Sequence, residues 1–370
     1  QVAPHVTWPQ AMGLVVVEGL LILLLAASGI RTMIVNAIPR SLKLAIGVGI
    51  GMFVALIGLV HAGFVTRRPD AANTEVPVQL GEGGRLMGWP IAVFGFGMVL
   101  MLALYSRRVP GAILFSILGA TGLAVIVEGV WHPGGWGLVT PTLPGNVVAW
   151  PDFSLFGQLD VFGSITQIPL ITLTVFVFTL VLSGFFDAIG AVLGVGEEAG
   201  LVDERGRMPT LGRIMVVDGI GAAFGGVTSS SANTVFVESA AGVKEGARTG
   251  LASVITGALF LVVMFASPLA AVIPQAAAAP ALVLVGALMA TQCRNIDWAD
   301  VEIALPSFLI IAIPAFTYSV TTGVGAGVVA YAVIKAARGK WREPGWLIWT
   351  LTAVFLAYFA IDAIELMAKG

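Results

Sequence analysis

Long apolar runs alternate with short polar segments along almost the whole chain. Uninterrupted runs reach about 17 to 25 residues, the length that an α-helix needs to cross the hydrocarbon core of a bilayer. We therefore expect membrane spans at 11–30, 44–66, 89–105, 110–130, 165–195, 211–227, 238–250, 251–273, 280–293, 301–318, 321–336 and 345–362. The runs within 211–250 are short and interrupted by glycine.

Composition supports the same class of protein. Hydrophobic residues make up 58% of the chain and charged residues only 11%, whereas a soluble domain of this length needs a more charged surface. The pattern predicts an all-α polytopic membrane protein. The single cysteine, Cys293, excludes a disulfide framework and a cysteine-rich metal site, and the net charge of −2 gives no reason to expect nucleic acid binding.

The basic residues between the spans predict the orientation. With the loop after the first span in the cytoplasm, and 211–250 counted as one out-and-back pair, most of the 19 basic residues fall inside. The exceptions are Arg67, Arg68, Arg85 and, at the tail, Lys369. The loop 131–164 then lies outside and is expected to link two halves of the chain.

Ionisable groups within membrane spans are expected to have a structural or functional role, because placing a charged side chain at a helix centre costs about 2.5–3.5 kcal/mol of insertion free energy. Glu128 is near the end of a span and is expected to reach the interface. His61 is expected to bond to a neighbouring helix. For Glu18, a structural hydrogen bond and a proton-relay role are both open.

The segment 218–243, DGIGAAFGGVTSSSANTVFVESAAGV, concentrates polarity between apolar runs. It carries Asp218 and Glu238, and Asp187 lies upstream among small residues. The residues before Glu238 favour a short extended segment, followed by a half-helix. Non-helical backbone at membrane depth survives only where it is buried in protein or lines a cavity. This segment is therefore expected to build a polar cavity for a substrate or an ion; polar packing between helices is the alternative.

The segments 36–59, 183–195 and 218–243 resemble the AzgA-like purine permeases, which belong to the nucleobase:cation symporter-2 (nucleobase–ascorbate transporter) family. The resemblance covers essentially the whole chain. It implies fourteen spans arranged as a 7+7 inverted repeat, with core and gate domains and a short β-strand before a broken half-helix. It also implies that this sequence starts at the fourth span, so that the first three spans are missing from it.

The resemblance divides the chain as follows. The expected parts are a core part at 1–33, a gate part at 34–130, the linker at 131–164, the core with the substrate site at 165–276, a second gate part at 277–338, and an extra C-terminal hydrophobic segment at 339–370.

The resemblance also implies roles for individual residues. Asp187 and Glu238 would contact the nucleobase, Asp218 would order the site, and Val237 would offer backbone atoms to the ring. The other candidates for substrate contact are Phe185, Phe236 and Ser239.

The chemistry of these residues suits a purine, which is flat and uncharged and has N–H donors along its edge. Carboxylates accept from such donors, and burial favours the neutral form of a carboxylate. Asp187, Asp218 and Glu238 are therefore also candidates for proton coupling. Ala191 stands where some members of the family have a histidine, which excludes a proton route through that position.

The resulting hypothesis is a proton symporter in the cell membrane that imports guanine, hypoxanthine or adenine by an elevator-type movement. Sodium coupling stays open, no cofactor or metal is expected, and the resemblance implies a homodimer through the gate domain. An anion transporter of the same fold is the alternative, although it would need a basic residue where Glu238 stands. An enzyme would need a nucleophile–base pair or a metal cluster, which the three scattered histidines and the single cysteine do not supply.

Overall fold

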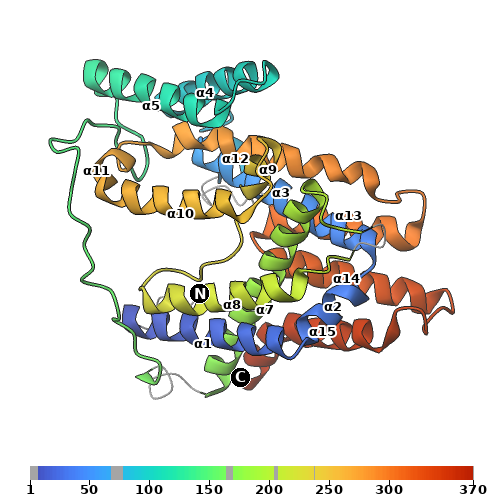
Figure 1. Ribbon diagram of the computed structural model, residues 1–370. Helices are drawn as coiled ribbons and strands as arrows, with labels where there is room; N and C mark the ends of the chain where they lie inside the picture. Colours follow the sequence, from blue (N-terminus) through green and yellow to red (C-terminus); the bar gives the residue numbers. More distant parts are fainter. Residues whose placement is uncertain (1–6, 68–77, 164–169, 204–206, 237, 370) are drawn as a thin grey trace. The chain divides into compact units, whose positions relative to one another are not determined.

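The computed structural model of the protein describes residues 7–67, 78–163, 170–203, 207–236 and 238–369 (Figure 1). It is helical apart from one antiparallel hairpin, in which β1 (Val65–Arg67) pairs with β2 (Val78–Leu80). The helices are α1 (Trp8–Ala27), α2 (Ile30–Ala37), α3 (Arg40–His61), α4 (Trp89–Ser106), α5 (Ala112–Trp131), α7 (Leu170–Glu198), α8 (Leu211–Val227), α9 (Ser239–Lys244), α10 (Gly250–Phe265), α11 (Ser267–Ala270), α12 (Gln275–Ala290), η2 (Thr291–Asn295), α13 (Val301–Thr317), α14 (Val320–Ala337) and α15 (Gly345–Lys369).

Seven helical stretches among the described residues are long and apolar enough to cross a membrane. They are Trp8–Ala27, Arg40–His61, Trp89–Ser106, Ala112–Trp131, Phe176–Glu198, Gln275–Asn295 and Val320–Ala337. Three further apolar helices, Gly250–Phe265, Val301–Thr317 and Gly345–Ala360, are shorter. The prediction of an all-α polytopic membrane protein is therefore confirmed at this level.

Two predictions around the polar segment differ from the structure. The span predicted at 238–250 is only the six-residue helix α9, and the chain then passes Gly246 with a left-handed φ of 111° before α10 begins. Residues 232–236 form neither helix nor strand, although a short strand was predicted there. A strand needs a neighbouring strand to bond to, and this segment packs on a helix instead.

The chain divides into two compact units. The first comprises Gln1–Met52, Phe153–Val243 and Met289–Gly370; the second comprises Phe53–Asp152 and Lys244–Leu288. The predicted core and gate domains are defined as parts that move against each other. A division into compact units does not test such movement, so the predicted domain boundaries stay a prediction.

In the first unit, α1 and α8 lie side by side with their backbones almost in contact (Figure 1). A Cβ added at Gly19 of α1 would overlap the backbone of Ala222 and Ala223 in α8. A Cβ at Gly219 would lie 2.8 Å from Leu23 Cα, which is also too close. Small residues that let helix backbones approach in this way are typical of membrane helix pairs.

The two ends of α1 are fixed by local bonds. At its start the backbone N–H of Thr7 donates to Oε1 of Gln10 at 3.0 Å, half of a capping box. At its end the chain turns at Gly29, whose φ of 75° is left-handed and therefore suits glycine. The turn starts α2 at Ile30, and this places Arg31 in the first turn of α2.

The second unit packs α4 beside α5 around a core that includes Val93, Ala120, Ala124 and Ala277. Glu128 of α5 accepts a hydrogen bond from Nε1 of Trp136 at 2.6 Å, so this carboxylate has a structural partner.

His61 is exposed at the end of α3. It makes no hydrogen bond to the described residues, so the bond predicted to a neighbouring helix is not formed among them.

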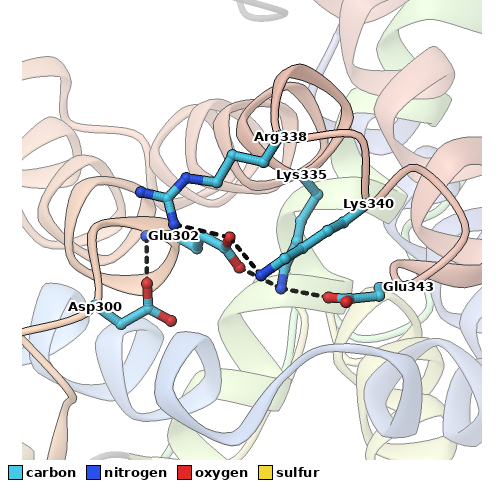
Figure 2. A network of polar contacts seen from close by, with 6 residues as sticks. All are labelled: Asp300, Glu302, Lys335, Arg338, Lys340 and Glu343. Carbon is cyan, nitrogen blue, oxygen red and sulfur yellow. Dashed lines mark hydrogen bonds and ion pairs between the residues drawn. The ribbon is translucent and has the colours of Figure 1, made fainter.

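A network of charges joins the start of α13, the end of α14 and the loop that leads into α15 (Figure 2). Its centre is Glu302, whose side chain is 3% exposed. Glu302 pairs with Lys335, and it accepts from Arg338 and Lys340, each at 2.9 Å. Lys335 also pairs with Glu343 at 2.6 Å. One buried carboxylate on α13 thus holds three cations from the stretch at the end of α14.

We expect Glu302→Gln to lower the thermal unfolding midpoint of the protein in detergent, because three cations lose their shared counter-charge. Arg338→Gln removes only one half-exposed partner and should lower the midpoint much less, as isolated exposed pairs contribute little. Thermal unfolding followed by circular dichroism compares the two variants. Equal midpoints for both would contradict a central role for Glu302.

Candidate functional site

The first unit contains a cavity of about 280 Å³ between α1, α7, α8 and the segment after α8. Its wall on α1 carries Glu18, and its wall on α7 carries Asp187. Residues three, four or seven positions apart share one face of a helix, and the lining follows this spacing. The lining residues are Val15, Glu18, Ile22, Leu180, Ser183, Gly184, Asp187, Asp218, Ala222, Ser231, Ala232 and Thr234.

The segment after α8 reverses and runs back along the same helix. The reversal occurs at Ser229, which has a left-handed φ of 60°. The returning backbone passes over Gly221 and Gly225, where added Cβ atoms would meet Asn233 and Ser231. The pair of glycines four residues apart therefore makes room for a second backbone against α8.

This reversal brings Thr234 back to Asp218, sixteen residues earlier in the chain. Oγ1 of Thr234 donates to Oδ1 of Asp218 at 2.8 Å. The non-helical segment is thus anchored to the carboxylate of α8 and forms one wall of the cavity.

Arg31 is the cation of the site. Its side chain is completely buried, and Nη1 donates to Oδ2 of Asp218 at 3.1 Å. Nη2 donates to the backbone carbonyl of Phe185 at 3.4 Å, and the guanidinium lies over the ring of Phe185, 5.1 Å from its centre. Arg31 therefore ties α2, α7 and α8 together and neutralises Asp218.

Asp187 lines the cavity and has spare acceptor capacity. Its Oδ2 accepts a long hydrogen bond, 3.3 Å, from Oγ of Ser183 one turn earlier. Its Oδ1 is buried and has no hydrogen-bond partner among the residues that the structure describes. A buried unpartnered oxygen costs free energy, so the carboxylate of Asp187 is suited to accept from a donor bound beside it.

The structure brings together only part of the predicted site. Asp187 and Asp218 both line the cavity. Phe185 is buried beneath Arg31 and is not part of the lining. Glu238 and Ser239 are exposed and lie outside the lining, as does Phe236, whose side chain is 65% exposed. Val237 lies outside the described residues. The roles of these residues remain predictions.

Sequence reasoning missed two residues of the site. Arg31 was counted among the cytoplasmic basic residues, yet it is buried and pairs with Asp218. Thr234 was treated as part of an extended segment, without a role of its own. The only signal for Arg31 in the sequence is a general one: a carboxylate in a membrane span, such as Asp218, needs a cation within reach, but the sequence does not say which cation.

Comparisons with known proteins identify the family of the chain. The chain belongs to the Permease family, whose sequence model matches residues 2–334. It is 33% identical to the guanine/hypoxanthine permease PbuG of Bacillus subtilis over 354 residues, covering 95% of this chain and 76% of that protein. It is 32% identical to the adenine permease AdeQ of Escherichia coli, covering 95% of this chain and 74% of that protein. It is 31% identical to the nucleobase transporter PlAzg2 of Paenibacillus larvae, covering 88% of this chain and 61% of that protein.

Membership of this family confirms the resemblance found in the sequence. It makes the chain a multi-pass membrane transporter rather than an enzyme, in agreement with the seven candidate spans.

Proposed function

We propose that this protein imports purine nucleobases, namely guanine, hypoxanthine or adenine, by proton symport. The support from outside the chain is the family, together with relatives named as guanine/hypoxanthine and adenine permeases. Under this proposal the fold is a 7+7 inverted repeat that works by an elevator-type movement of its core domain. A homodimer through the gate domain is part of the same proposal.

One observation carries the proposal most directly: Asp187 lines a half-open, mostly apolar cavity, and its Oδ1 has no hydrogen-bond partner among the described residues. A purine is flat, and its edge carries N–H groups that a carboxylate accepts well. The apolar lining, which includes Leu180 and Ala222, suits the faces of the ring. A site of this kind, apolar with a few placed polar groups, is typical of small-molecule binding.

The composition of the cavity argues against the anion transporter. Three carboxylates line it, from Glu18, Asp187 and Asp218. The guanidinium of Arg31 already pairs with Asp218 and is completely buried. An inorganic or carboxylate anion would meet uncompensated negative charge, whereas a neutral purine would not.

Uptake into proteoliposomes tests the proposal. The full-length protein should accumulate labelled guanine, hypoxanthine or adenine when the outside is acidic, and this accumulation should collapse when a protonophore dissipates the gradient. Uracil and sulfate serve as controls for substrate class. Uptake driven by a sodium gradient, with the same pH on both sides, would show that sodium rather than the proton is the coupled ion. Uptake of sulfate without uptake of any purine would support the anion transporter instead.

A further inference from the structure

Glu18 occupies an unusual position in the cavity. Its side chain is on the face of α1 that also carries Val15 and Ile22, and the residue is only 5% exposed. Its carboxylate makes no hydrogen bond or ion pair with any residue that the structure describes. Oε1 lies 2.5 Å from the point where a Cβ of Gly184 would be, so the absence of a side chain on Gly184 makes room for it.

The charged groups that face Glu18 come from the three helices packed against α1. They are Asp187 on α7, Asp218 on α8 and Arg31 on α2. The only cation among them, Arg31, is bound to Asp218 at 3.1 Å. Among the described residues, Glu18 and Asp187 therefore share this space without a cation of their own.

Two unpaired carboxylates in such a space cannot both stay ionised at low cost, because burial and like charge each favour the neutral form. The cavity thus needs to take up a cation, and a proton is the smallest one. The three acids differ in how readily each could carry it. Asp218 is already paired with Arg31 and accepts a hydrogen bond from Thr234. Asp187 already accepts from Ser183. Glu18 alone has no described partner.

We propose that Glu18 carries the coupled proton, while Asp187 binds the purine. This inference rests on the proposed function. Glu18 takes up a proton from the outside water and becomes a carboxylic acid; the purine then binds beside a neutral group. When the cavity opens inward, the acid releases the proton to the cytoplasm and returns to the carboxylate. Glu18 thus couples transport to the proton gradient. Purine binding itself does not require a contact with Glu18.

Titration calorimetry on the full-length protein, run in two buffers of different ionisation enthalpy, measures the protons taken up when guanine, hypoxanthine or adenine binds. Wild-type binding should weaken as the pH rises, by up to about tenfold per pH unit, with uptake of protons. Glu18→Gln, which imitates the neutral acid, should bind with the affinity that the wild type shows at low pH. Its binding should be independent of pH and take up no protons.

Transport separates this role from a merely structural one. In proteoliposomes Glu18→Gln should exchange labelled purine for unlabelled purine but should not accumulate it under a pH gradient. Glu128→Gln is the matched control, since it makes the same substitution at a carboxylate bonded to Trp136. It should keep both proton uptake and accumulation.

Each contrary result has a distinct meaning. A Glu18→Gln protein that still takes up protons on binding, or still accumulates purine, overturns the role of Glu18. A folded Glu18→Gln protein that binds no purine at any pH makes Glu18 a substrate contact and also overturns it. Should Glu18→Gln fail to fold, Glu18→Asp decides: its pH dependence should shift, and an unchanged profile overturns the role. If the wild-type protein binds no purine, both the proposed function and this inference are wrong.

Discussion

Replacing Arg31 by alanine should destabilise the protein by about 3–5 kcal/mol, because it leaves the carboxylate of Asp218 buried without its cation. The guanidinium bonds to Asp218 on α8 and to the carbonyl of Phe185 on α7, so its loss also releases two helices from α2. Purine binding should be lost as well, since Asp218 anchors Thr234 in the cavity wall. Thermal unfolding in detergent and calorimetric binding measure the two effects.

A second variant tests whether the pair or the individual charges matter. Arg31→Met combined with Asp218→Leu removes both charges and replaces them with apolar side chains of similar size. This double variant should recover most of the lost stability, as replaced buried ion pairs often do, but it should not recover purine binding. A single Arg31→Ala variant as stable as the wild type would contradict the structural role of the pair.

Asp187→Asn should weaken purine binding by about 100-fold, a loss of roughly 2.7 kcal/mol. The amide keeps the size of the side chain but presents an N–H donor where the carboxylate presents only acceptors. A purine N–H that meets this donor loses its partner, and the donor remains unsatisfied. Calorimetric titration with the purine that the wild type binds best measures the change.

Ser183→Ala is the matched control for that substitution. It removes the one described partner of Asp187, which donates over a long 3.3 Å bond, and leaves the carboxylate in place. It should weaken binding only a few-fold. If Asp187→Asn bound purine as tightly as the wild type, Asp187 would not be the nucleobase contact, and the proposed site would move to Glu238 and its neighbours.

The sequence predicted most spans closely because apolar runs of membrane length have few other structures open to them. The span predicted at 211–227 coincides with α8, and the span at 301–318 differs from α13 by a single residue. The prediction failed at 238–250, where small residues and Gly246 allow the chain to leave the helix. Hydropathy records the apolar character of such a segment but not its backbone conformation.

The candidate site was predictable in part for a similar reason. Asp187 and Asp218 stood out because carboxylates are costly in a span, and both do line the cavity. Arg31 was missed because a basic residue near a span end is usually a topology signal. Its burial depends on the turn at Gly29, which directs α2 back toward α8, and no pattern in the sequence reports that tertiary contact.

The glycine contact between α1 and α8 also bears on how this transporter can evolve. Gly19 and Gly219 have no substitute, because even one added methyl group would strike the backbone of the facing helix. Variation in substrate preference must therefore arise at other positions, such as those around the cavity. Ser183 and Ala232 line it without that constraint. Laboratory selection for a new nucleobase should accordingly find its substitutions on α7 and on the segment after α8, while the glycine positions stay unchanged.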